Sequence, residues 1–185
     1  MPEPVFAQAE RRSFLVPILL ALAALALAVV IAIHFFPATT INAELIHTDL
    51  LAKQTVFKSQ TIIVGGQTED TLFVASTIKV DNLTRAPIYL DGFDLSFSNP
   101  DDAQLTAKAL TKDEIANAEL SFPDLKPLVT NPLLRDTAID PGKSAQGTIV
   151  FSLPIPKTMW DARKVATIAI EIYHRSPVFQ DIPKS

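Results

Sequence analysis

Residues 88–97 read IYLDGFDLSF, and this stretch indicates the class of fold. Its apolar residues fall on even positions as far as Leu90 and on odd positions from Phe93 onward. A strand that is buried on one face has apolar residues at every second position. The change of phase at Asp91-Gly92 therefore predicts a β-strand that contains a β-bulge.

Three further stretches alternate in the same way. Their apolar positions are Leu72, Val74, Ile78 and Val80, then Ile149, Phe151 and Leu153, and finally Ile168, Ile170 and Ile172. Residues 84–87 and 140–143 have the composition of turns between strands, and so does Gly65-Gly66. Only part of residues 103–120 has a helical composition. The pattern predicts a mainly β fold, an antiparallel β-sandwich of about six to eight strands with one short helical excursion.

Two stretches resemble immunoglobulin-like domains of membrane-anchored bacterial envelope proteins. Residues 78–88, IKVDNLTRAPI, are similar to a strand, an Asn-containing turn and a second strand of those domains. Residues 140–151, DPGKSAQGTIVF, are similar to their Pro-Gly turn, glycine and Phe-bearing strand. The first stretch also resembles, more weakly, water-stress and late-embryogenesis-abundant type 2 domains. The resemblance implies an immunoglobulin-like sandwich of unknown function over residues 70–99 and 134–173.

The N-terminal part contains an apolar run without a charged residue, residues 14–36. At about 1.5 Å per residue, a helix over this run is roughly 34 Å long, and the hydrocarbon core of a bilayer is about 30 Å thick. We therefore expect a transmembrane helix there. A cleaved signal peptide is the alternative, but its apolar centre is shorter, at about 7–15 residues.

Arg11 and Arg12 directly precede this run, and the first cation after it is Lys53. Positive residues favour the cytoplasmic side, so we expect a cytoplasmic N-terminus and a C-terminal domain in the periplasm or outside the cell. A ridge of small residues within the run is a candidate helix–helix contact, formed by Ala24, Ala28 and Ala32. The expected parts of the chain are a cytoplasmic tail (1–13), a membrane helix (14–36), a stalk (37–54), the sandwich (55–178) and a C-terminal tail (179–185).

Candidate catalytic and metal-binding groups are few. The chain has no cysteine, which excludes disulfides and thiol chemistry. Neither His47 nor His174 stands in a zinc-binding or hydrolase motif, so we expect no catalytic residue, no metal and no cofactor. Two alternatives remain: Ca²⁺ bound by loop carboxylates between Asp91 and Asp102, and a hydrolase that uses one of the histidines.

Two other sites each have two interpretations. Trp160, the only tryptophan, is a candidate partner contact, with packing into the core as the alternative. Asn82-Leu83-Thr84 is a formal glycosylation acceptor, with an Asn-bearing turn as the alternative.

The charge pattern bears on the class of partner. The net charge is −4 and no cationic stripe is present, so we expect no nucleic-acid partner. We expect a non-enzymatic, single-pass protein of the inner (plasma) membrane that presents a binding or assembly module. Its expected partners are the lipid bilayer and a larger membrane complex or a second copy. The alternatives are a self-standing envelope protein that binds a ligand and one that protects against stress.

Overall fold

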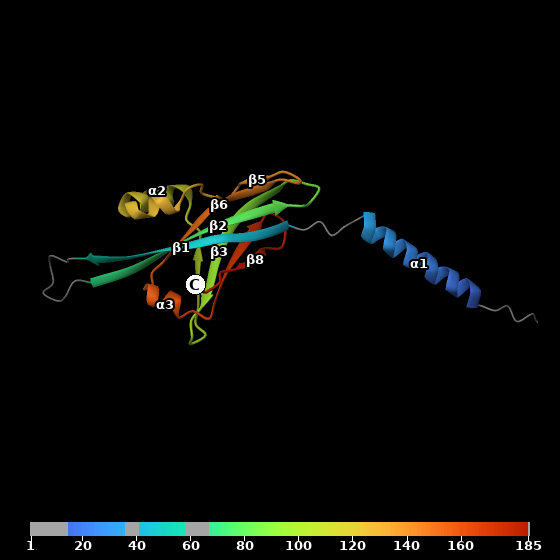
Figure 1. The fold of residues 1–185 in the computed structure, drawn as a ribbon, viewed down its shortest axis with the longest axis horizontal. Helices are drawn as coiled ribbons and strands as arrows, with labels where there is room; N and C mark the ends of the chain where they lie inside the picture. The colour runs from blue at the N-terminus through green and yellow to red at the C-terminus, as the bar shows by residue number, and fades with distance from the viewer. Residues whose placement is uncertain (1–14, 36–40, 58–66, 185) are drawn as a thin grey trace, which may run out of the picture. The chain divides into compact units, whose positions relative to one another are not determined.

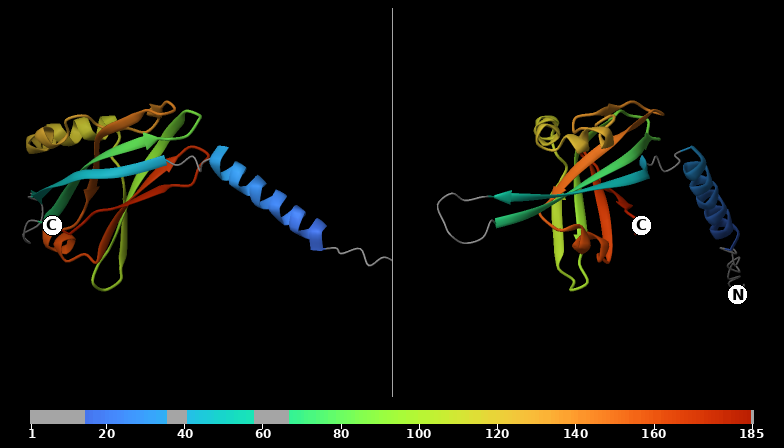
Figure 2. Two further views of the ribbon diagram at one scale, coloured as in Figure 1. Left: turned by 45° about the vertical axis from the view of Figure 1, so that its right-hand side comes forward. Right: turned by 60° about the vertical axis from the view of Figure 1, so that its left-hand side comes forward.

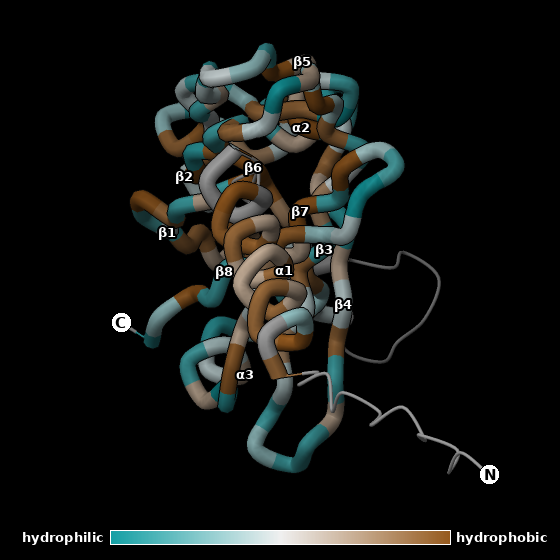
Figure 3. Tube along the Cα trace, turned by 90° about the vertical axis from the view of Figure 1, so that its right-hand side faces the viewer, coloured by the Kyte–Doolittle hydropathy of each residue, from teal (hydrophilic) through white to brown (hydrophobic). Residues whose placement is uncertain are grey.

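The computed structural model describes residues 15–35, 41–57 and 67–184 (Figure 1). The chain divides into two compact units, Met1–Thr39 and Thr40–Ser185. The first unit contains the helix α1 (Leu15–Phe35), along which hydrophobic residues run (Figure 3). In the part of the chain whose side chains the structure describes, no helix is long and apolar enough to cross a membrane.

The second unit is a sandwich of two β-sheets (Figure 2). The first sheet has the order β1-β2-β6, with the bounds Ile41–Phe57, Gln67–Asn82 and Ser144–Leu153. The second has the order β4-β3-β7-β8, with the bounds Gln104–Lys108, Ile88–Ser98, Val165–Ile172 and Val178–Asp181. The short strand β5 (Ala138–Ile139) pairs with β3. All pairs between named strands are antiparallel, so the predicted mainly β, antiparallel sandwich is confirmed.

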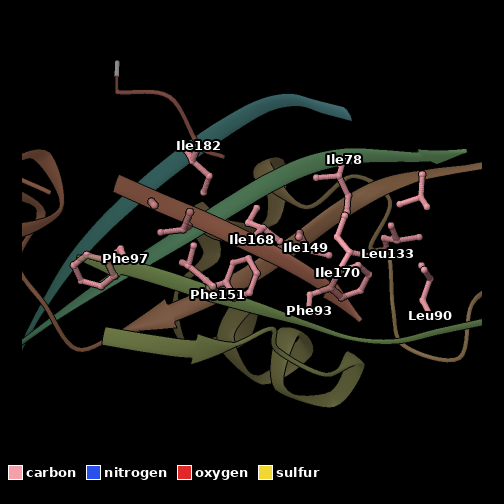
Figure 4. Packing of buried hydrophobic residues seen from close by; sticks show 14 of the residues in the cluster. Ile78, Leu90, Phe93, Phe97, Leu133, Ile149, Phe151, Ile168, Ile170 and Ile182 are labelled. Carbon is pink, nitrogen blue, oxygen red and sulfur yellow. The ribbon is translucent and has the colours of Figure 1, made fainter. Parts of the chain in front are cut away.

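The main hydrophobic core lies between the two sheets (Figure 4). All the alternating apolar residues that the sequence predicted on one face of a strand belong to this core. In β3, the core includes Ile88 and Leu90 before the bulge and Phe93, Leu95 and Phe97 after it. The ladders of β3 and β7 shift register between Leu90 and Gly92. The predicted bulge at Asp91-Gly92 is therefore confirmed, because an extra residue on β3 restores the inward direction of Phe93.

A second, smaller core lies on the outer face of the β1-β2-β6 sheet. Here α2 (Lys112–Ser121) and the 3₁₀ helix η1 (Pro123–Leu128) contribute Ile115 and Leu125, which cluster with residues of β2 and β6. The strand residues in this cluster are Phe73, Ala75 and Val150. The predicted helical excursion is thus confirmed, and it covers one sheet. A further short α-helix, α3 (Lys157–Asp161), precedes β7.

Two of the three turns predicted from composition, those at 84–87 and 140–143, are present and meet at Asn82. Gly142 has a φ of 70°, and the Lys143 N–H donates to the Asp140 carbonyl at 3.0 Å. Asn82 is fully buried, and its Nδ2 donates to the carbonyls of Ala86 at 2.9 Å and Ile139 at 2.8 Å. A buried amide with these bonds belongs to a turn, so the Asn-bearing turn is confirmed against the glycosylation acceptor. Gly65-Gly66 lies outside the described residues.

The predicted stalk, residues 37–54, is wrong over its described part, because β1 begins at Ile41 and pairs with β2 along its whole length. A bulge between Leu45 and His47 moves the core-facing positions from odd residues to even ones. This shift hides the alternation from a reading of the sequence. The sandwich therefore begins at β1, not at residue 55.

The predicted C-terminal tail, residues 179–185, is also wrong in its described part. Strand β8 continues to Asp181, and the next residue, Ile182, is buried. The Ile182 N–H donates to the Ala166 carbonyl at 2.8 Å, and Arg163 Nη2 donates to the Pro183 carbonyl at 2.8 Å. These bonds hold the end of the chain against the sandwich.

Candidate functional site

A cleft of about 540 Å³ lies at the bulge of β3. We call it the bulge cleft, and its lining comprises residues 91–94, residues 108–112, residues 133–135 and Glu171. One wall is therefore formed by β3 and β7. The opposite side is formed by two connecting segments that cross between the sheets.

Backbone hydrogen bonds fix both connecting segments. In the first, the Ala109 N–H donates to the Phe93 carbonyl of one sheet at 2.9 Å, and the Leu110 N–H donates to the Val150 carbonyl of the other at 2.7 Å. In the second, the Leu133 N–H donates to the Thr148 carbonyl at 2.9 Å. The walls of the cleft are thus tied to both sheets, as expected of a largely preformed site.

The start of α2 places a lysine at the rim of the cleft. Thr111 is the N-cap, and its hydroxyl accepts from the Glu114 N–H at 3.4 Å. Glu114 Oε2 accepts in return from the Thr111 N–H at 2.8 Å, which completes a capping box. The Thr111 N–H contributes most to a lowered pKa of Glu114, and the Thr111 hydroxyl, which donates to the same carboxylate oxygen at 2.9 Å, lowers it further. Lys112 is the first residue of the helix and directly follows this cap.

Arg135 is paired inside the cleft wall. Its Nη2 donates to Asp91 Oδ1 at 3.1 Å and to the hydroxyl of Tyr173 at 3.4 Å, and its Nε lies 3.8 Å from Asp136 Oδ2. The hydrogen bond to Tyr173 and the neighbouring carboxylates raise the pKa of Arg135 further above its ordinary value. Arg135 and Asp91 therefore neutralise each other.

Four other charged side chains line the cleft: Asp94, Glu171, Lys108 and Lys112. Among the described residues, none of the four forms a hydrogen bond or an ion pair through its side chain. The two carboxylates belong to β3 and β7, and the two ammonium groups to β4 and α2. The cleft thus carries two unpaired charges of each sign, a set that suits a charged ligand.

The calcium-site alternative is not supported by the arrangement of the acidic residues. Asp91 and Asp94 lie at the bulge, whereas Asp102 follows the far end of β3 and pairs with Lys164 Nζ at 2.5 Å. The strand between them keeps the two groups apart. Within the described ranges, no group of three or more histidine or acidic side chains is placed to hold a metal ion.

Trp160 is 1% exposed, so its prediction as a partner contact is wrong and the core interpretation is confirmed. Its ring lies 5.5 Å from that of Phe97, and the guanidinium of Arg163 stacks 4.3 Å from its centroid. Arg163 is itself buried and Nη1 donates to the Trp160 carbonyl at 3.0 Å. Burial lowers the pKa of Arg163 from its ordinary value.

Neither His47 nor His174 lines the cleft. His47 is in β1, where its Nε2 is 3.3 Å from Asp49 Oδ2 and 3.4 Å from Thr77 Oγ1. A catalytic triad needs the acid and the nucleophile on different ring nitrogens, so this contact does not have triad geometry. His174 follows β7 with a φ of 57°, beside the ring of Tyr173.

The N-terminal candidates remain predictions. Ala24, Ala28 and Ala32 all lie in α1, where they follow one another at helical spacing. Arg11 and Arg12 lie outside the described residues.

No protein-family model matches this chain, and no curated protein matches it. Among solved structures, it is similar to the yjhA protein from Bacillus subtilis, with 17% identity, a TM-score of 0.40, and coverage of 73% of this chain and 77% of the other. An uncharacterized β-sandwich protein from Clostridium difficile 630 gives 8% identity, a TM-score of 0.40, and coverage of 80% and 88%. A conserved hypothetical protein from Bacillus anthracis gives 12% identity, a TM-score of 0.32, and coverage of 79% and 99%. The β-sandwich is established by the sheets of this chain themselves.

The sequence indicated one part of the cleft and missed the rest. The phase change at Asp91-Gly92 identified the bulge. Lys108, Lys112 and Glu171 come from other segments, and no pattern in the sequence connects them. The pairing of β3 with β4 and β7 brings Lys108 and Glu171 to the bulge, and the bond from the Leu110 N–H to the Val150 carbonyl fixes the segment that leads to Lys112.

Proposed function

We propose that this chain is a single-pass membrane protein that presents the β-sandwich outside the cytoplasm as a non-enzymatic binding module. The bulge cleft is the observation that carries the binding role. Its fixed walls and its four unpaired charges suit the capture of a ligand. The hydroxyl that lines the cleft, Thr111 Oγ1, donates to Glu114 Oε2 at 2.9 Å, and this bond belongs to the cap of α2.

The charge-free run of residues 14–36 supports the membrane placement, and Arg11-Arg12 supports a cytoplasmic N-terminus. The resemblance of residues 70–99 and 134–173 to immunoglobulin-like envelope domains is consistent with this placement. In this proposal the helix anchors the protein in the membrane, and the sandwich binds the ligand.

The absence of cysteine makes the topology directly testable, because a single introduced cysteine is then the only thiol. Gln8→Cys reports on the N-terminus, and Thr106→Cys reports on an exposed position of β4. We expect a membrane-impermeant maleimide to label Thr106→Cys in intact cells or spheroplasts, and Gln8→Cys only after permeabilisation. Labelling in the opposite order contradicts the proposed orientation.

Extraction of the membranes gives the second test. The full chain should remain in the membrane pellet after carbonate treatment, and a variant that lacks residues 14–36 should be released. Release of the full chain contradicts the anchor.

Mass spectrometry of the full chain purified in mild detergent identifies what is bound to the sandwich. A bound small molecule supports the binding module, and a protein at fixed stoichiometry indicates an accessory subunit instead.

A further inference from the structure

We propose that the bulge cleft binds a small zwitterion, a molecule that carries a primary ammonium group and a carboxylate or phosphate a few ångströms apart. Amino acids, short peptides and phosphoethanolamine head groups share this chemistry. The inference rests on the proposed binding function and adds the class of ligand.

The bulge leaves space around the carboxylates of Glu171 and Asp94, so both are accessible to a ligand. Glu171 lies opposite Gly92 in the β3–β7 ladder, and a Cβ at position 92 would lie 3.3 Å from Glu171 Oε2. The glycine therefore leaves room above the strand for the Glu171 side chain. Asp94 is on the same strand as Gly92, two residues further along, and is half-buried. Together, Glu171 and Asp94 form an acidic wall for an ammonium group.

The two lysines of the lining come from β4, the strand that pairs with β3, and from the helix that follows it. Lys108 is the direct cross-strand neighbour of Asp94, yet no ion pair joins them. Lys112 stands in the first turn of α2 beside Asp113 and Glu114, and its exposed side chain lines the cleft.

The balance of charge selects the ligand class. Arg135 is already paired with Asp91, so the available groups are two carboxylates and two ammonium groups. Glu171, Lys108 and Lys112 are exposed to solvent, so none of them requires a partner for stability. An anion would pair only with the lysines and a cation only with the carboxylates, whereas a zwitterion pairs with both at once. The volume of about 540 Å³ lies within the range of small-molecule sites, roughly 300–1,000 Å³.

The test is isothermal titration calorimetry on the purified full chain in detergent. The zwitterionic probes are glycylglycine and O-phosphoethanolamine, and the singly charged controls are acetate, inorganic phosphate and ethylammonium. We expect binding of at least one zwitterion, at least tenfold tighter than any control. Binding of glycylglycine alone indicates peptides, and binding of phosphoethanolamine alone indicates head groups.

Variants locate the site. Lys108→Gln/Lys112→Gln and Glu171→Gln should each weaken binding at least tenfold and leave the thermal midpoint unchanged, because these side chains have no partner to lose. Lys126→Gln, an exposed lysine of η1, is the matched control and should bind normally. The inference is overturned if no zwitterion binds at 50 mM, or if binding persists in both cleft variants. Either result leaves the membrane topology untouched, since cysteine labelling tests that separately.

Discussion

The outer faces of the two sheets differ in what covers them. On the β1-β2-β6 sheet, Phe73 of β2 is 3% exposed, because α2 and η1 pack over it. On the β3 sheet, Phe179 of β8 is 66% exposed, and its cross-strand neighbour is Ala169, which Thr167 and Glu171 flank on the same face of β7. The outer face of the β1-β2-β6 sheet thus packs into a second core, whereas the outer face of the β3 sheet is exposed to solvent and ends at the bulge cleft.

The comparison shows how burial on both faces changes a strand. Residues Leu72–Ile78 of β2 are all buried, with apolar side chains directed to both sides of the sheet. Strand β7 alternates between buried and more exposed residues, because only its inner face has a partner layer. The open face can therefore carry charges such as Glu171 without a desolvation cost.

Phe73→Ala should show the largest difference between the faces. The change removes a buried ring that lies 5.3 Å from the ring of Phe122 and leaves a cavity. We expect a loss of about 3–5 kcal/mol in the free energy of unfolding, measured by urea denaturation. Phe179→Ala on the open face is the matched control, with an expected change within about 0.5 kcal/mol. Equal losses would mean that the helical layer does not bury the first sheet.

A pair of glycines gives the next largest effect. A Cβ at Gly147 of β6 would lie 2.4 Å from the Asn131 carbonyl oxygen and 2.9 Å from Leu133 Cβ. Gly147→Ala must therefore displace backbone, at an expected cost of about 1–3 kcal/mol. Gly92→Ala meets only the end of the flexible Glu171 side chain, so its loss of stability should be smaller. Thermal unfolding of both variants tests this order.

The cap of the covering helix should have a smaller effect. Thr111→Ala removes the N-cap hydroxyl that accepts from the Glu114 N–H. We expect a loss of about 1 kcal/mol in denaturant unfolding. Thr111→Ser keeps the hydroxyl and should recover most of the loss. Full loss in Thr111→Ser would show that the methyl group, not the cap, is responsible.

The pH dependence of the same cap should be the smallest effect. The hydrogen bonds from Thr111 lower the pKa of Glu114 in the folded state. Their stabilisation is therefore present above the ordinary pKa of a glutamate and is lost as the pH falls through the lower, folded value. Between pH 5 and pH 3, the wild type should lose more stability than Glu114→Gln. Glu119→Gln, on the same helix and without a cap bond, should behave as the wild type.

Much of the fold was predictable because strand periodicity is a local property. Four strands, the bulge at Asp91-Gly92 and the turns at 84–87 and 140–143 were each visible within about ten residues. Strand β1 was missed because its own bulge, between Leu45 and His47, divides its alternation into two short parts. Trp160 was ambiguous because a single aromatic residue has no period, and only the packing of Phe97 and Arg163 against it decides its burial.

By itself, the sequence determined the class of fold and the positions of most strands, since alternation and turn chemistry act between near neighbours. It also placed an extra residue in β3, from which the cleft follows. Only the tertiary structure decided which face α2 covers and which charges share the cleft. The reason is that Lys108 and Glu171 reach the bulge through strand pairing, and Lys112 follows through the segment that links β4 to α2. No local pattern encodes that pairing.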